Sequence, residues 1–147
     1  MNRRAKILRI GIASREQMKA RTMAIARGEY KPAADEPKVW FTSMESLAQV
    51  LSTRNALLLT MIRQARPESI QELAKLTGRQ PSNLSRTLRT MERYRFVKLE
   101  KSNGTIVPNV PYDRLAFEHE IETSQMAIPI SFQAAQLELK KTGTRHV

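Results

Sequence analysis

The sequence predicts a mainly α fold with a small β component (α+β), and one stretch, residues 69–110, carries most of that prediction. A Ser-x-x-Glu capping pattern at Ser69 opens a first helix, and Gly78 stands where a left-handed residue would end it. Pro81 then suits the first turn of a second helix. The Ser-Asn-Gly run at 102–104 predicts a hairpin turn between two short strands. Helix, turn, helix and hairpin in this order is a winged helix-turn-helix arrangement.

The two predicted helices each have an apolar face. The first carries Glu72, expected to return a hydrogen bond to the backbone of Ser69, and an apolar set made of Ile70, Leu73, Ala74 and Leu76. The second places Leu84, Leu88 and Met91 at a spacing of four and three, which predicts a buried stripe. Its other face consists of hydrogen-bond donors and cations: Ser82, Asn83, Ser85, Arg86, Arg89 and Arg93.

The elements before this stretch begin with residues 6–12, whose alternation predicts a short strand. Ser14 and Gln17 then fit a capping box, and a helix is expected to about Arg27 with a moderately apolar face made of Met18, Met23, Ile25 and Ala26. This helix has two interpretations. The favoured one is a scaffold or dimerisation arm, and the other is a phosphate-binding surface formed by Arg15, Lys19, Arg21 and Arg27.

A polar, proline-bearing linker at 31–38 leads to the central helices. Trp40 and Phe41 are expected in the core or at an interface. Thr42 and Glu45 have capping-box spacing, which predicts a helix with Leu47, Val50 and Leu51 facing inward. A further helix over 53–65 holds Leu57, Leu58, Met61 and Ile62. After the hairpin, Leu115 and Phe117 alternate with Ala116 and Glu118 and predict a closing strand.

These elements suggest three regions. Residues 1–38 form a basic N-terminal strand–helix and linker, 39–122 the winged helix-turn-helix, and 123–147 a C-terminal tail. Because the tail is too short to fold alone and too apolar for a simple linker, it is expected to bind a partner. The residues expected at that contact are Ile128, Ile130, Phe132 and Leu137.

Composition excludes several function classes. The chain has 147 residues and a formal net charge of +11, which favours a polyanionic partner. It has no cysteine, suiting a reducing cytoplasm, and no apolar run near the roughly 20 residues that a membrane span needs. Neither of the two histidines has a ligand set around it, so we expect no metal and no cofactor. No catalytic motif is present, which argues against an enzyme.

Local charge makes double-stranded DNA the expected partner. Residues 79–101 hold seven Lys or Arg against two Glu. Arginine, asparagine and glutamine discriminate bases in the major groove, and the residues expected in that role are Gln80, Ser82, Asn83, Arg86 and Arg89. Phosphate or wing contacts are expected from Arg79, Ser85, Arg93, Lys98, Lys101 and Asn103. The alternative for each arginine is a solvated helix face or a pair with Glu92, open to Arg89 or Arg95. A homodimer is expected because such proteins commonly read two half-sites.

Residues 67–115, together with Phe41–Leu47 and Val110–Asp113, resemble a prokaryotic family of winged helix-turn-helix regulators that is distantly similar to MarR- and ArsR-type repressors. The resemblance covers about Val39 to Ile121. It implies a DNA-binding transcriptional regulator, and some members resemble the antitoxin of a toxin–antitoxin pair, which implies a toxin held by the tail. The alternatives are a protein-interaction module with secondary DNA binding and, less favoured because aromatic residues for base stacking are few, an RNA-binding protein.

Overall fold

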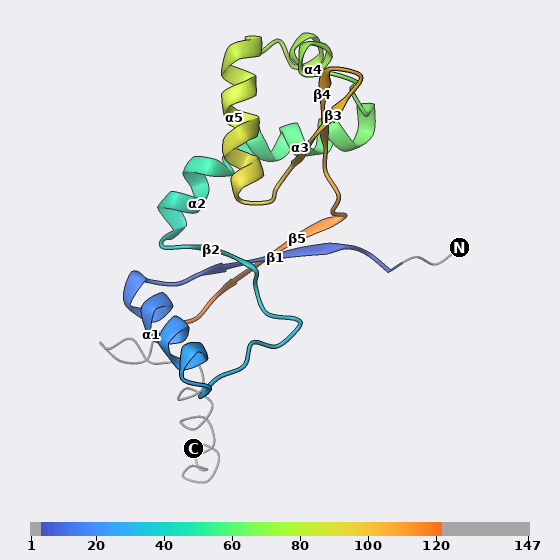
Figure 1. Ribbon diagram of the computed structural model, residues 1–147. Helices are drawn as coiled ribbons and strands as arrows, with labels where there is room; N and C mark the ends of the chain where they lie inside the picture. Colours follow the sequence, from blue (N-terminus) through green and yellow to red (C-terminus); the bar gives the residue numbers. More distant parts are fainter. Residues whose placement is uncertain (1–3, 122–147) are drawn as a thin grey trace.

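The computed structural model describes residues 4–121, and in this range the chain is an α+β protein built in two parts (Figure 1). A three-stranded sheet contains β1 (Ile7–Ile12), β2 (Val39–Phe41) and β5 (Arg114–His119). Between β2 and β5 the chain forms a winged helix-turn-helix module. This module lies on one side of the sheet, and α1 (Arg15–Ala26) lies on the other. The expected fold class is confirmed.

The sheet is parallel throughout, and β1 is its central strand. Ile10 is in register with Val39 of β2 on one side and with Phe117 of β5 on the other. The alternation of apolar and polar residues predicted β1 and β5, but nothing in the sequence predicted β2. A run of only three residues after Pro37 gives no recognisable period, and its pairing with β1 supplies the strand geometry instead.

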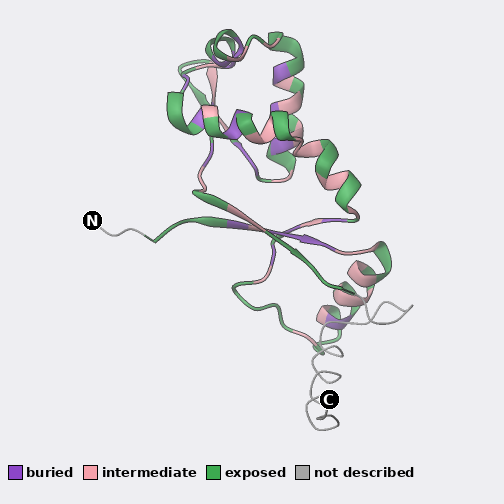
Figure 2. Ribbon diagram, turned by 180° about the vertical axis from the view of Figure 1, so that it is seen from behind, coloured by how far each residue is buried: buried purple, intermediate pink, exposed green. Residues whose placement is uncertain are grey.

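One face of the sheet joins the module in a single core (Figure 2). Leu8 and Ile10 of β1 and Phe41 of β2 are at most 3% exposed. The Phe41 ring stacks on Tyr94 with 4.5 Å between ring centroids. From the module, the core receives the side chains Leu58, Leu59, Ile62, Ile70, Leu73, Ala74, Leu84, Leu88, Met91, Phe96 and Val97. The module therefore packs directly on this face of the sheet.

The other face of the sheet packs toward α1. The predicted capping box is present, because Ser14 Oγ accepts from the Gln17 N–H and the Gln17 side chain accepts from the Ser14 N–H. The predicted apolar face is wrong in detail. Ala24 is the buried residue of this helix, whereas Met23 is 42% exposed. A contact between this helix and the sheet is made by Arg21, whose guanidinium lies 5.2 Å from the ring centroid of Trp40 in β2.

The module consists of α2 (Met44–Val50), α3 (Thr53–Ala65), α4 (Ile70–Thr77), α5 (Pro81–Arg93) and the hairpin strands β3 (Lys98–Ser102) and β4 (Thr105–Asn109). Gly78 ends α4 in the left-handed region at φ 73°, as predicted. The hairpin turn has positive φ at both Asn103 and Gly104, which is the backbone of a type I′ turn. The residues at these two turns therefore give the sequence of helices and hairpin strands that was predicted.

Several local expectations within the module are wrong. The cap of α2 is Ser43 with Ser46, not Thr42 with Glu45, because Ser43 is the residue whose hydroxyl reaches the third backbone N–H. Ser69 does cap α4, but the Glu72 carboxylate accepts from the Glu68 N–H instead of the Ser69 N–H.

Two apolar residues lie outside the buried faces of their helices, and for Leu76 this differs from expectation. Leu57 is 60% exposed, since Leu58, Leu59 and Ile62 form the buried face of α3. Leu76 is 49% exposed near the end of α4. In both helices the buried stripe is narrower than the apolar sequence pattern.

A polar clamp fixes the module to the sheet at the return of the chain. The Arg63 guanidinium, on α3, donates to the Asp113 carboxylate at 2.9 Å and to the backbone carbonyls of Val110 and Tyr112. The other Asp113 oxygen accepts from the Lys6 N–H at 2.7 Å. One arginine thus ties a helix of the module to the connection that starts β5 beside β1.

Candidate nucleic-acid interface

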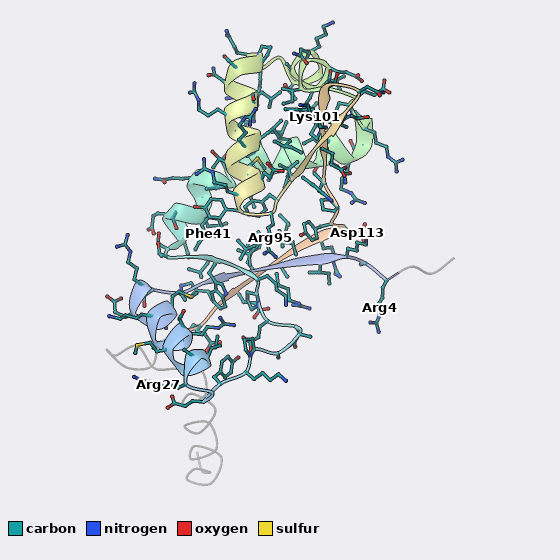
Figure 3. The ribbon with its side chains drawn as sticks, viewed as in Figure 1. Arg4, Arg27, Phe41, Arg95, Lys101 and Asp113 are labelled. Carbon is teal, nitrogen blue, oxygen red and sulfur yellow. The ribbon has the colours of Figure 1, made fainter. Side chains whose placement is uncertain are left out.

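The outward face of α5 is polar and basic. Leu84, Leu88 and Met91 are fully buried, so the opposite side of the helix faces solvent. Arg86 lies about 160° around the helix from both leucines, at 100° per residue. The predicted base-reading residues Gln80, Ser82, Asn83, Arg86 and Arg89 are all exposed. Figure 3 shows long side chains projecting from this helix away from the rest of the molecule.

The N-terminus of α5 has free backbone donors. Pro81 occupies the first turn, and the N-cap residue Gln80 makes no side-chain hydrogen bond to it. In each of the other four described helices a serine caps the first turn. The first N–H groups of α5 therefore remain available, and the helix dipole places partial positive charge beside them.

The turn into α5 is held by α3. The Thr77 hydroxyl accepts from the Arg79 N–H at 3.2 Å, and the Arg79 guanidinium donates to the Arg54 carbonyl and to Asn55 Oδ1 at 3.2 and 3.1 Å. Partial burial, and then the neighbouring Arg54 charge, lower the pKa of Arg79 from its ordinary value. Arg79 thus positions the turn between α4 and α5 while still contributing positive charge near it.

The wing reaches the same surface as the start of α5. A shallow groove of about 430 Å³ is lined by Ser82 and Ser85 of α5 and by Gly104 and Thr105 of the wing, with Gln71 of α4 at its side. Lys98, Lys101 and Asn103 are exposed on the hairpin. The outward face of α5 and the wing tip are therefore adjacent, although the rest of α5 and strand β3 separate them in sequence.

The arginines of α5 are not neutralised within the fold. Among residues 4–121, Arg86, Arg89 and Arg93 have no ion-pair partner. The expected alternative, a pair between Glu92 and Arg89 or Arg95, is not formed, because the Glu92 carboxylate accepts from the Leu99 N–H at 3.0 Å. On the wing, Lys98 meets Glu100 at 3.7 Å, and both side chains are more than half exposed.

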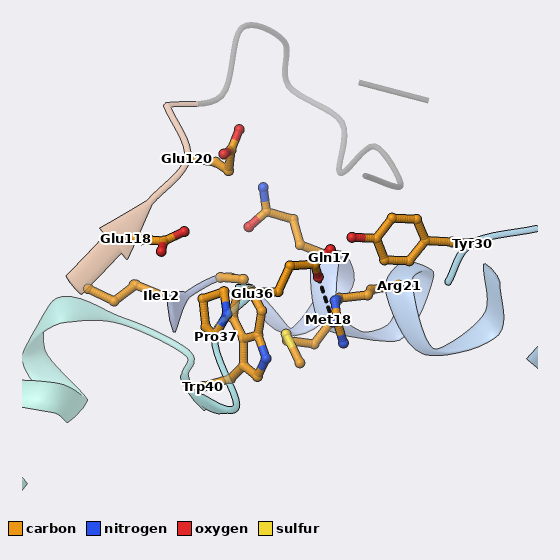
Figure 4. Close-up of a pocket in the computed structure, with 11 residues that line it drawn as sticks. Ile12, Gln17, Met18, Arg21, Tyr30, Glu36, Pro37, Trp40, Glu118 and Glu120 are labelled. Atoms are coloured by element: carbon orange, nitrogen blue, oxygen red, sulfur yellow. Dashed lines mark hydrogen bonds and ion pairs between the residues drawn. The ribbon is translucent and has the colours of Figure 1, made fainter. Parts of the chain in front are cut away.

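The second basic region, α1, is less suited to phosphates than its composition indicates (Figure 4). Arg21 pairs with Glu36 at 2.9 Å, and only 12% of its side chain is exposed. Its guanidinium also lies over the rings of Tyr30 and Trp40, at 5.8 and 5.2 Å from their centroids. Arg21 is therefore a structural residue that holds the linker against α1, which corrects its expected place among phosphate contacts. Arg15, Lys19 and Arg27 are exposed.

The remaining expectations concern residues outside this surface. The proposed partner-binding residues Ile128, Ile130, Phe132 and Leu137 lie outside the described residues. Over residues 4–121, no three acidic or histidine side chains gather in a geometry that could hold a metal. In the same range, no helix combines the length and apolar character that crossing a membrane requires.

The matches to known families and structures each cover about half of the chain. A protein-family model described as HVO_A0114 matches residues 50–117, from the end of α2 to β5. Among solved structures, the chain is similar to the crystal structure of the predicted DNA-binding transcriptional regulator from E. coli, with 21% identity, a TM-score of 0.41, and coverage of 48% of this chain and 75% of that chain. No curated protein matches the chain. Neither match is to a MarR- or ArsR-type repressor, so that resemblance stays a prediction.

Proposed function

We propose that this protein is a sequence-specific double-stranded DNA-binding transcriptional regulator that reads the major groove with α5. The observation that carries the proposal is the outward face of α5, which bears Asn83 near a free helix N-terminus and, further along, three arginines without an ion-pair partner in the described chain. The α5 helix can enter the major groove, which is about 12 Å wide, because an α-helix with its side chains has a similar diameter.

Distinct side chains would have distinct tasks at this interface. Asn83 can pair with the N6 and N7 edge of adenine, and Arg86 and Arg89 with O6 and N7 of guanine. Ser82 and Gln80 would contact bases near the first turn. The uncapped N–H groups at the start of α5 suit a phosphate oxygen, because donors and the helix dipole act together there.

The wing and the ends of α5 would set position rather than sequence. Lys98, Lys101 and Asn103 lie on the hairpin, and Arg93 lies at the end of α5, where they would meet phosphates or the minor groove. Ser85 lines the groove next to the wing tip and would contact the backbone there. Arg79 would act mainly by fixing the turn, since its guanidinium already has two acceptors on α3.

The regulatory role that we propose is autorepression by a dimer, because two copies can read two half-sites about one helical turn apart. An antitoxin function, with a toxin bound by residues 124–147, remains a prediction that concerns residues outside the described range. Deleting that segment should abolish toxin binding and spare DNA binding if the antitoxin function is correct.

The test begins with selection of binding sites from random duplexes, followed by mobility shifts of the selected site, the region upstream of its own gene and a scrambled duplex at two salt concentrations. A sequence-specific regulator keeps its preference at about 0.15–0.2 M salt, where nonspecific binding has weakened steeply. Equal and salt-sensitive binding to all duplexes would refute the proposal. Preference for a selected site but not for the upstream region would refute autorepression alone.

Variants locate the interface. Asn83→Ala or Arg86→Ala should weaken binding to the selected site by about 1–3 kcal/mol and relax specificity at one position. Arg27→Ala, which removes one positive charge from the exposed residue that follows α1, is the matched control for Arg86→Ala and should leave binding unchanged. Unchanged affinity in both α5 variants would mean that α5 does not face the groove as proposed.

A further inference from the structure

We propose that the outer edge of β5 is a dimer interface, at which two copies of this chain join their sheets into one six-stranded sheet. In the described chain the strand order is β2-β1-β5, so the outer edge of β5 pairs with no other strand. An open edge with unpaired backbone groups is a template for another strand. This inference stands on the backbone and the charges of β5 and does not depend on the proposed function.

The backbone of β5 presents its hydrogen-bonding groups outward at two apolar residues. The Arg114 N–H donates to the Lys6 carbonyl, so the backbone of Arg114 points inward to β1. Because N–H and C=O directions alternate along a strand, Leu115 and Phe117 direct both groups toward the open edge. Phe117 is also 50% exposed, on the face of the sheet that bears the module. In residues 4–121, no strand pairs with the outward backbone groups of Phe117, and half of its side chain is uncovered.

Two-fold symmetry fixes how a second copy can pair. A two-fold axis perpendicular to the sheet makes the two β5 strands antiparallel and brings residues of the same face opposite each other. With the axis at Ala116, Leu115 pairs with Phe117 of the partner subunit, and each pair exchanges two backbone hydrogen bonds. The same register places Arg114 opposite Glu118 of the partner subunit. The two-fold axis generates a second copy of the apolar contact and of the charged contact.

Charge is the observation that selects a second copy as the occupant. Arg114 is exposed and has no ion-pair partner in the described chain, while Glu118 meets Arg9 at 3.4 Å with about half of its side chain exposed. Charges on an edge strand can also keep strands apart. Here their signs are self-complementary in the antiparallel register, so they attract a copy of the same strand. A shift of the axis to Phe117 would oppose Leu115 with a histidine and Ala116 with a carboxylate. The other edge strand, β2, has only three residues.

The test uses the full chain and contains no DNA. Sedimentation velocity from about 1 to about 100 µM measures the dimerisation constant of the wild type and of the charge-reversal variants Arg114→Glu and Glu118→Arg. Each variant alone places two like charges opposite each other at both repeats, so dimerisation should weaken by about tenfold or more. Mixed in equal amounts, the two variants restore opposite charges at both contacts, and dimers should return. Lys75→Glu, at an exposed residue of α4, makes the same change in net charge as Arg114→Glu and should dimerise as the wild type does.

Amide exchange provides a measurement that does not depend on the variants folding. In the wild type, the amides of Leu115 and Phe117 should become protected as concentration rises through the dimerisation constant, whereas those in the wing should not change. A wild type that stays monomeric at about 100 µM, because its own tail covers the edge or for any other reason, would overturn the proposal. Single variants that dimerise normally, or a mixture no tighter than its components, would overturn it as well.

Discussion

Replacing Gly11 with alanine gives a sharp test of how the sheet packs against α1. An alanine Cβ at this position would lie 2.3 Å from Cζ3 and 2.4 Å from Cε3 of Trp40, at least 1 Å inside the 3.4–4 Å of an ordinary contact. The indole cannot move away freely, because the Arg21 guanidinium lies over it at 5.2 Å and is itself bound to Glu36. Gly11→Ala must therefore shift either β1 or this whole cluster.

The loss of stability can be estimated for a shift of β1 and for a shift of the Trp40 cluster. Forcing one extra carbon into a packed site costs about 1–3 kcal/mol, and a rigid ring at this distance favours the upper part of the range. Displacing the indole instead sacrifices its cation–π contact, of the order of 0.5–2 kcal/mol, and part of its burial. We expect Gly11→Ala to lower the free energy of unfolding by about 2–3 kcal/mol.

Urea unfolding followed by circular dichroism measures this change, with a double-mutant cycle as the control. In a Trp40→Leu background the flexible side chain can give way, so Gly11→Ala should be neutral or stabilising by up to about 0.5 kcal/mol through the loss of chain entropy in the unfolded state. A Gly11→Ala protein as stable as the wild type would refute the packing argument. The same penalty in both backgrounds would refute the role of Trp40.

Four further predictions concern the module, its surface and the end of α1. Leu88→Ala removes a fully buried side chain from α5 and should cost about 2–5 kcal/mol in urea unfolding. Ser69→Ala removes the cap of α4 and should cost about 1 kcal/mol in the same assay. Lys101→Ala should weaken every duplex about equally and reduce the salt dependence of binding by about one counterion in mobility shifts. Arg27→Ala should leave both DNA affinity and its salt dependence unchanged.

Each of these predictions has an outcome that contradicts it. A Leu88→Ala protein within about 1 kcal/mol of the wild type would mean that the α5 core is not packed as described. A Ser69→Ala protein as stable as the wild type would mean that other contacts, and not this cap, stabilise the start of α4. Loss of affinity for one sequence only in Lys101→Ala would make the wing a base reader. A reduced salt dependence in Arg27→Ala would place α1 on phosphates after all.

Local signals made much of the module predictable. Gly78 needed a left-handed backbone, Pro81 suited a first helical turn, and Asn103 with Gly104 suited a tight hairpin, and each requirement concerns only a few neighbouring residues. The buried stripe of α5 was likewise readable, because Leu84 and Leu88 repeat at helical spacing and have the bulk to fill a core. These features depend on backbone geometry that the residues themselves impose.

The sheet was less predictable because its partners are distant in sequence. Val39–Phe41 becomes a strand only through its register with Ile10–Ile12, and no local period marks it. Arg21 looked like a surface cation, since nothing near it in sequence announces Glu36, Tyr30 and Trp40 as its neighbours. Glu92 looked like a partner for arginines one turn away, whereas the start of β3 provides a backbone N–H for it. Side-chain availability at the candidate site depends on such long-range contacts.

The place of β1 in the middle of the sheet has a kinetic consequence. Just before β1 and β5 pair, hydrogen bonds join Lys6 and Asp113, which are 107 apart in sequence, while the helix and hairpin contacts of the module are much closer along the chain. Closing such a long loop is slow compared with forming local contacts. The local contacts of α5 and the wing can therefore form before β5 finds β1. Until β5 arrives, the strand at the centre of the finished sheet is an edge, open to any other extended chain nearby.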